Sequence, residues 1–354
     1  MTADLSWPVI LGRLIEKTAL DRAAASWAMG QIMSGEAADA QIGGFMIGLR
    51  AKGESVDELA GLVDVMLERA VILDTGNDAV DIVGTGGDMV GTVNVSSMAS
   101  ILTASTGLPV LKHGSRSASG KTGSSEMLEV LGIRLDLSPE RVAEVFREVG
   151  ISFFFAPVFH PAMRHVAPMR KQLGVPTTFN FLGPLGNPAQ PIATSLGVAN
   201  LAIAPLMAAE MAARARTALV FRGNDGLDEL TTTDTSRVWQ VTGGEVTEHL
   251  LEPHRFGIAR AEHAQLLGGD AHFNAQVARD LFDGKTDGNL GAVRDIVVLN
   301  SAAGVVSYEL AKDSSRADVD LDVRFADAIE RVTRALESGA AREKLSQWIA
   351  ATQV

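Results

Sequence analysis

Apolar residues recur at helical spacing over the first seventy positions. Residues 42–49 carry them at i, i+3, i+4 and i+7, which is the stripe of an amphipathic helix. Ser55-x-x-Glu58 is a capping box that opens a further apolar stripe over 59–70, and an earlier helix is expected over 18–35. Such short helices bury little surface alone. The pattern therefore predicts that they pack on one another, on the rest of the chain, or on a second copy.

The pattern changes after residue 77. Short apolar runs now alternate with helical patterns, and we expect strands at residues 81–83, 108–111, 133–137, 151–156, 194–198, 217–221 and 296–300. Strands separated by helices favour a mostly parallel sheet with both faces covered. The predicted fold is α/β: a small helical N-terminal domain and a larger domain whose central, mostly parallel sheet is flanked by helices.

A segment from about 165 to 191 interrupts this alternation with a basic amphipathic stretch and a Gly/Pro loop. A chain of 354 residues favours two domains. We expect residues 1–74, joined by about 165–191, to form the helical domain. Residues 78–164 and 192–354 then form the α/β domain.

Charge and composition narrow the class of protein. The net charge is −12 and the pI is about 5.1, which argues against general nucleic-acid binding. The absence of cysteine excludes disulfides, thiolate zinc sites and cysteine nucleophiles. The N-terminus lacks a signal-peptide pattern, and no apolar run approaches the roughly 18 residues of a membrane span. We expect a cytoplasmic protein that binds neither nucleic acid nor a membrane.

A glycine loop after the first predicted strand is the first candidate site. Its sequence is Gly84-Thr-Gly-Gly87-Asp88. Hydroxyl and amide side chains follow at Thr92, Asn94, Ser96 and Ser97. Backbone N–H groups without a Cβ, next to a helix N-terminus, bind phosphate groups. The order differs from the Walker loop and from G-x-G-x-x-G. A tight structural turn is the alternative, but it would not explain the polar cluster, so anion binding is favoured.

The next predicted strand runs into a second polar loop, from Lys112 to Ser125. It holds three glycines, five serines and three cationic residues. A loop this long within a compact domain is usually functional, although a solvated surface loop is the alternative. Two such loops on successive strands predict one pocket at the carboxyl edge of the sheet.

Two further segments carry candidate chemistry. Adjacent Asp228 and Glu229 offer hard oxygen ligands, which suit Mg²⁺ held between protein and substrate phosphates. A solvated acidic turn is the alternative. Arg170 could hold a carboxylate in a bidentate fork beside apolar surface, and His160 could form a polar pocket wall. For His165 a structural role is favoured.

In this order the segments resemble the anthranilate phosphoribosyltransferases of tryptophan biosynthesis. The segments that carry the resemblance are Gly84-Thr-Gly-Gly-Asp, Asn94-Val-Ser-Ser, Lys112-His-Gly, Phe179-Asn-Phe-Leu-Gly-Pro-Leu and Asp225-Gly-Leu-Asp-Glu-Leu. The resemblance runs from the N-terminal helices to the Val298-Leu-Asn-Ser-Ala-Ala segment. It implies a discontinuous helical domain used for homodimerisation, and phosphoribosyl pyrophosphate and anthranilate as substrates.

The resemblance also assigns roles to residues of this sequence. Those implied to surround phosphoribosyl pyrophosphate are Gly84, Gly87, Asp88, Thr92, Asn94, Val95, Ser96, Ser97, Lys112, Ser119, Gly120 and Ser124. Those implied to face anthranilate are Gly84, His113, Ser115, His160 and Arg170. Ser96, Asp228 and Glu229 are implied to hold two Mg²⁺ ions. No catalytic acid or base is expected, because an aniline is nucleophilic without prior deprotonation and positioning matters more.

The sequence departs from the family pattern near the acceptor side. Ser115 stands where the family has asparagine, and it is too short to span the same gap. Met89 stands where a glycine usually continues the first loop, so a positive φ there would be strained. Gly120 replaces a serine and Ser97 a threonine, which are milder changes. A different aromatic acceptor or weak activity therefore stays open.

Two alternative functions would place the protein in a different class. A pyrimidine nucleoside phosphorylase would share the architecture, but the Asn180-Phe-Leu-Gly-Pro-Leu segment and the Asp228–Glu229 pair argue for the transferase. A non-enzymatic paralogue that binds nucleic acid would show a basic groove and eroded phosphate loops, which the net charge and the intact glycine loop oppose.

Overall fold

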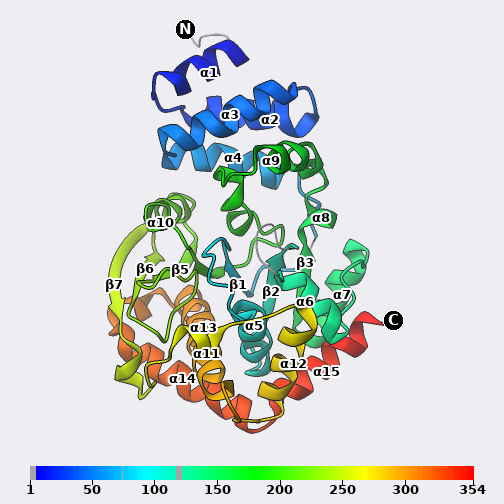
Figure 1. The fold of residues 1–354 in the computed structure, drawn as a ribbon, viewed down its shortest axis with the longest axis vertical. Coiled ribbons are helices and arrows are strands. Elements are labelled where there is room, and N and C mark those ends of the chain that lie inside the picture. The colour runs from blue at the N-terminus through cyan, green and yellow to red at the C-terminus, as the bar shows by residue number, and fades with distance from the viewer. Residues whose placement is uncertain (1–4, 74, 117–121) are drawn as a thin grey trace.

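The computed structural model describes residues 5–73, 75–116 and 122–354. The chain begins with a bundle of α1 (Trp7–Ile15), α2 (Arg22–Ser34), α3 (Asp39–Lys52) and α4 (Val56–Glu68), which sits at one end of a larger α/β body (Figure 1). The Ser55–Glu58 capping box is confirmed. The expected helix start at residue 18 is wrong, because Asp21 caps α2 by accepting the Ala24 N–H at 2.8 Å.

A seven-stranded sheet forms the centre of the α/β body, in the order β3-β2-β1-β4-β5-β6-β7. The strands are β1 (Val80–Gly84), β2 (Val110–Gly114), β3 (Ile151–Phe155), β4 (Ala193–Gly197), β5 (Thr217–Gly223), β6 (Ser236–Thr242) and β7 (Glu245–Leu251). The first five pair in parallel, and β6 and β7 add an antiparallel hairpin at one edge. The mostly parallel sheet is confirmed. The sequence pattern missed the hairpin.

Further helices follow the bundle along the chain, and most of them flank this sheet (Figure 1). They are α5 (Val95–Ser105), α6 (Ser124–Leu131), α7 (Pro139–Val149), α8 (Ala156–Phe159), α9 (Ala167–Leu173), α10 (Ala204–Ala213), α11 (His263–Leu266), α12 (Ala271–Phe282), α13 (Leu290–Lys312), α14 (Leu321–Glu337) and α15 (Ala340–Thr352). Short 3₁₀ turns occur at η1 (Pro161–His165), η2 (Thr178–Asn180), η3 (Gly183–Leu185), η4 (Pro253–Phe256) and η5 (Ser314–Asp318).

Two expected strands are wrong. Residues 133–137 alternate between buried and exposed as a strand would, but their backbone bonds elsewhere. The Ile133 N–H donates to Leu128 O at the end of α6, and the Arg134 N–H donates to the Thr352 hydroxyl on α15. Residues 296–300 lie inside α13. That run is apolar on every side because the helix is surrounded by protein, and periodicity cannot separate such a helix from a buried strand.

Helix α13 is the central helix of the α/β body. Its 18-residue window has a mean hydropathy of 1.4, long and apolar enough to span a membrane by length and composition. This contradicts the expectation that no apolar run approaches that length. However, 72% of the window is buried inside the protein, where α13 packs against α5, α14, β4 and β5. The long apolar run is accounted for by this burial.

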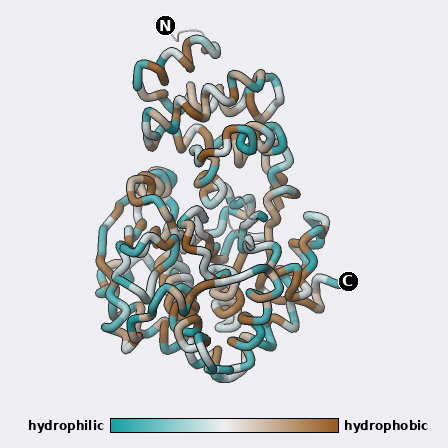
Figure 2. The backbone as a smooth tube through the Cα atoms, viewed as in Figure 1, coloured by the Kyte–Doolittle hydropathy of each residue, from teal (hydrophilic) through white to brown (hydrophobic). Residues whose placement is uncertain are grey.

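The segment between residues 165 and 191 lies against the helical bundle. Helix α9 packs on α3, and η1 packs on α2 (Figure 1). Phe179, Phe181 and Leu182 are buried in the same apolar cluster as residues of α1 to α4 and α10. Along the bundle helices, apolar and polar positions alternate around each axis (Figure 2). The apolar faces of the bundle therefore meet this later segment as well as one another.

Candidate active site

The carboxyl ends of β2, β1 and β4 lie side by side and carry the loops expected to bind ligand. In the first loop, Gly86 and Gly87 have φ of +68° and +85°. Met89, where a positive φ was expected to be strained, has φ of +61° and is 82% exposed. A left-handed conformation costs a residue with a Cβ about 1–2 kcal/mol.

Asp228 sits directly on the ends of β1 and β4. Its Oδ2 accepts the Gly86 N–H at 2.7 Å. A Cβ on Gly84 would lie 2.3 Å from Asp228 Oδ2, and a Cβ on Gly197 would lie 1.6 Å from the Asp228 carbonyl oxygen. Only glycine at these two strand ends leaves room for the acidic segment. The glycine loop and the acidic pair thus form one site, although Gly86 and Asp228 are 142 residues apart in sequence.

The turn that presents Asp228 and Glu229 is tied by the carboxylate of Asp225. Asp225 accepts hydrogen bonds from the Leu227 N–H at 3.2 Å and the Thr231 hydroxyl at 2.6 Å. The Thr233 hydroxyl is a further donor. Sequence reasoning missed this role, although an Asp followed by Gly and a run of threonines is typical of a side-chain-bonded turn.

Asp228 is buried and Glu229 is half-buried, and a further carboxylate lies beside them. Burial, followed by the neighbouring negative charge of Asp88, raises the pKa of Asp228 to about 7. Burial and the charge of Asp228 likewise raise the pKa of Glu229, which accepts a backbone hydrogen bond from Ser96. The predicted metal ligands Ser96, Asp228 and Glu229 are therefore brought together. Excess buried negative charge is the setting that a bound cation relieves.

These side chains suit a Mg²⁺ ion that is shared between protein and substrate better than a metal ion that is held by protein ligands alone. Within the described ranges, no group of three or more His, Asp or Glu side chains is arranged as a metal cage. Mg²⁺ usually keeps several waters and binds through one or two carboxylates together with substrate phosphates. Two carboxylates beside a phosphate loop match that preference.

Lys112 and Asp81 lie beneath the loops. Lys112 is buried, donates to Ile82 O at 2.5 Å, and lies 3.4 Å from Ser96 Oγ. Its pKa is lowered by burial, against the opposing charges of Asp81 and Glu229. Burial raises the pKa of Asp81 to about 6, while Lys112 favours its charged form. Sequence reasoning missed Asp81; the signal was a lone charge within the apolar strand Val80–Gly84.

Asn94 joins the two polar loops. Its Oδ1 accepts from Asn274 Nδ2 at 2.8 Å, and its Nδ2 donates to Thr122 O at 3.3 Å. Asn274 was likewise missed as a partner. Of the neighbouring candidates, Thr92 bridges to Leu267, Val95 is buried in the core, and the buried Ser97 hydroxyl has no partner among the described residues.

The second loop is described only at its two ends. Ser115 is exposed at its start, and Ser124, which opens α6, donates from its hydroxyl to Ser115 O at 3.3 Å. The candidates Ser119 and Gly120 lie outside the described residues. A Cβ on Gly114 would lie 2.7 Å from Ser124 Oγ, so the two ends of the loop approach closely.

His113 and His160 form a pair of neutral rings beside the Gly183 and Gly186 carbonyl groups. Their ring centroids are 5.2 Å apart. His113 Nδ1 lies 3.1 Å from Gly183 O, and His160 Nε2 lies 2.8 Å from Gly186 O. The remaining ring nitrogens are buried without a partner in the described part of the chain. Burial lowers the pKa of His113 to about 3 and also lowers that of His160.

Arg170 on α9 is a partly buried cation. Its pKa is lowered by burial. Across residues 5–73, 75–116 and 122–354, its guanidinium has no hydrogen bond or ion pair. A desolvated, unpaired guanidinium favours a planar anion such as a carboxylate. This is the chemistry expected of Arg170 from the sequence.

The comparisons with known proteins agree with this geometry. Residues 8–70 match the helical bundle domain of a glycosyl transferase family, and residues 76–342 match its a/b domain. The anthranilate phosphoribosyltransferases of Leifsonia xyli subsp. xyli and Nocardioides sp. are 53% and 52% identical, over 100% and 98% of this chain and 100% and 99% of their own. The anthranilate phosphoribosyltransferase from Thermus thermophilus superposes with a TM-score of 0.87 at 36% identity, covering 98% of this chain and 99% of its own.

The fold and the site define a glycosyl transferase built from a helical bundle and an α/β domain. Relatives that are more than half identical over nearly the full length of the chain narrow the assignment from this class to one family. The chain belongs to the anthranilate phosphoribosyltransferase family.

The buried neutral state of His113 predicts a loss of stability in acid. Because its folded pKa of about 3 lies below the ordinary value of 6.5, folding releases a proton, and stability present above pH 6.5 is lost as the pH falls toward 3. Each pH unit in that window removes about 1.4 kcal/mol. Urea denaturation of the parent and of His113→Gln at several pH values should show their stability difference shrinking below pH 6.5. Parallel curves would contradict the buried neutral ring.

Proposed function

We propose that this protein transfers the phosphoribosyl group of phosphoribosyl pyrophosphate to the amine of anthranilate, giving N-(5-phosphoribosyl)anthranilate and pyrophosphate for tryptophan biosynthesis. The observation that carries the proposal is the contact between the glycine loop and the buried Asp228. It joins a phosphate-binding loop to carboxylates suited to Mg²⁺. Family membership at this identity supports the same reaction.

The proposed site has a phosphoribosyl side and an acceptor side. The phosphoribosyl pyrophosphate side comprises Gly84, Gly87, Asp88, Thr92, Asn94, Val95, Ser96, Ser97, Lys112 and Ser124, with Ser119 and Gly120 from the part of the loop outside the described residues. The anthranilate side comprises Gly84, His113, Ser115, His160 and Arg170. Ser96, Asp228 and Glu229 would hold two Mg²⁺ ions, which supply positive charge to the pyrophosphate leaving group.

The residues of the chain act chiefly by orientation and charge. As the bond from ribose C1 to pyrophosphate breaks, negative charge develops on the leaving group, and backbone N–H groups of the glycine loop and Lys112 stabilise it. Arg170 fixes the anthranilate carboxylate so that its amine faces C1. The histidine pair stays neutral, so it adds no positive charge that would oppose the cation-like ribosyl group.

The domain division expected from the sequence is part of the proposal. Residues 1–74 and about 165–191 would form one unit, because α9 and η1 pack on α3 and α2. We place the reaction in the cytoplasm, where charged phosphorylated substrates are retained.

Val9, Ile15 and Ile47 expose apolar side chains on α1 and α3, and Ile15 is 81% exposed. Such a surface favours burial against a second copy. We therefore expect a homodimer, and light scattering after size exclusion should give about twice 37.3 kDa at micromolar protein. Ile15→Asp should shift the population toward the monomer because it places a charge in an apolar interface. A parent that elutes as a monomer at every concentration would contradict the dimer.

The reaction itself is tested by the loss of anthranilate fluorescence when protein, Mg²⁺ and phosphoribosyl pyrophosphate are mixed. Rapid loss in the parent is the expected result. Ser115→Asn should act at least as fast, because the longer amide offers both a donor and an acceptor to anthranilate. Loss that appears only in Ser115→Asn would keep the chemistry and point to another preferred aromatic acceptor. No loss in either protein would contradict the assignment and favour nucleoside phosphorolysis.

The acidic pair is tested by Asp228→Ala/Glu229→Ala. We expect turnover to fall by more than about 100-fold, because charge on the leaving group loses its stabilisation. Isothermal titration should show that Mg²⁺ no longer binds together with pyrophosphate, while circular dichroism remains that of the parent. Glu245→Ala, an exposed acidic residue on β7, is the control and should change neither quantity. Unchanged turnover in the double variant would remove the pair from the mechanism.

A further inference from the structure

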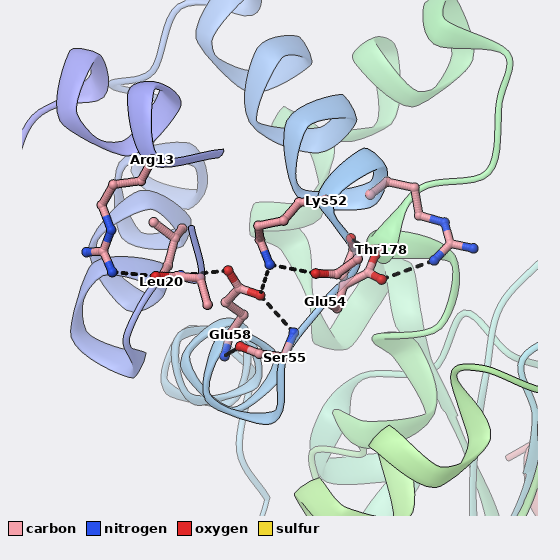
Figure 3. Close-up of polar contacts among 10 residues, drawn as sticks. Arg13, Leu20, Lys52, Glu54, Ser55, Glu58 and Thr178 are labelled. Atoms are coloured by element: carbon pink, nitrogen blue, oxygen red, sulfur yellow. Dashed lines mark hydrogen bonds and ion pairs between the residues drawn. The ribbon is translucent and has the colours of Figure 1, made fainter. Parts of the chain in front are cut away.

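Glu54 lies between two helices of the bundle and is tied to a distant part of the chain. It follows the end of α3, and its side chain is fully buried. Its Oε2 accepts from Arg50 Nη1 at 3.0 Å, and its Oε1 accepts from the Thr178 hydroxyl at 2.6 Å. Figure 3 shows Glu54 beside Thr178, although the two residues are 124 positions apart in sequence. A buried carboxylate keeps its charge only where such donors are present.

The segment around Thr178 makes further contacts with the same corner of the bundle. The Arg50 guanidinium lies 5.9 Å from the centroid of the Phe181 ring. Asn180 Oδ1 accepts the Thr177 N–H at 3.0 Å and closes the short η2 turn. Thr178 itself is fully buried. The turn is therefore held in one conformation, with its hydroxyl directed at Glu54.

The η2 turn stands between the groups assigned to the acceptor side. Arg170 precedes it on α9. After it, the carbonyl oxygens of Gly183 and Gly186 bond to His113 and His160. The turn is therefore linked through the chain to Arg170 and to the carbonyl groups that contact both histidines, whereas Asp228 contacts the glycine loop directly.

We propose that the Glu54–Thr178 hydrogen bond positions the acceptor side of the site, so that Glu54 and Thr178 are positioning residues for the aromatic amine substrate. This inference rests on the proposed function. Neither residue touches a reacting atom. Their effect is on how the acceptor is held, and phosphoribosyl pyrophosphate binding is independent of them.

Glu58, in the first turn of α4, supplies a matched control. It too is fully buried, and it accepts from the Leu20 N–H, the Ser55 N–H and Lys52 Nζ, each at 2.8 Å. In Figure 3 the contacts of Glu58 lie on the side of the α3–α4 connection that faces away from Thr178. Glu58 thus stabilises the N-terminal helices without touching the η2 turn.

The experiment compares Thr178→Val, Thr178→Ser and Glu58→Gln with the parent in steady-state kinetics and hydrogen exchange. Thr178→Val should raise the KM for anthranilate about tenfold, the size expected when a hydrogen bond to a charged group is lost. Its KM for phosphoribosyl pyrophosphate should stay within about twofold, because this loss does not reach the phosphate loops. Amide exchange should quicken over 177–187. Thr178→Ser keeps the hydroxyl and should restore the parent values.

Each outcome bears on the proposal. Glu58→Gln should lower the melting temperature and leave both KM values unchanged. The proposal is overturned if Thr178→Val changes neither KM, if it changes both equally, or if Glu58→Gln gives the same anthranilate effect. If the parent consumes no anthranilate, the proposed function fails. Exchange over 177–187 then decides on the positioning contact itself, and unchanged exchange in Thr178→Val would overturn it.

Discussion

The site depends on the seating of Asp228 on the glycine ends of two parallel strands. Its carboxylate bonds the Gly86 N–H, and its backbone lies so close to Gly84 and Gly197 that neither could carry a Cβ. This contact brings carboxylates together in a desolvated setting. Burial first, and then the charge of a neighbouring carboxylate, raises the pKa values of Asp228 and Glu229. Negative charge is thereby concentrated beside a loop suited to phosphate. A cation between the carboxylates and the phosphate groups would neutralise their repulsion.

The acceptor side uses different electrostatics. Its histidines are buried and neutral, and its one free charge is the guanidinium of Arg170, judged among the described residues. These groups come from the sheet and from the segment that packs on the bundle, so their arrangement depends on how the two parts of the chain meet. In the proposed assignment, a carboxylate-bearing aromatic ring would meet a cation and uncharged walls on this side. Magnesium ligands and backbone N–H groups would serve the polyphosphate side.

Sequence periodicity identified the amphipathic helices and the parallel strands, but it did not separate a buried helix from a strand and it missed the exposed edge of the sheet. The stripe of α3 and the capping box of α4 were predictable, because each signal is local. Residues 296–300 were misread because α13 is enclosed by protein, so its apolar run has no polar side to reveal the period. The hairpin of β6 and β7 was missed because it lies at the sheet edge, where β7 is mostly exposed and has no apolar alternation.

The sequence by itself determined the chemistry available: glycines and hydroxyls for phosphate, paired carboxylates for a cation, and an arginine for an acid, on a mostly parallel sheet. It also drew attention to Met89, because the resembling family usually has a glycine at this position, and Met89 does have a positive φ. Only the tertiary structure decided which groups meet. The seating of Asp228, the burial of Asp81 beside Lys112 and the bond from Glu54 to Thr178 join residues distant in sequence. Such contacts arise from the packing of elements, and no local pattern encodes their distances or their burial.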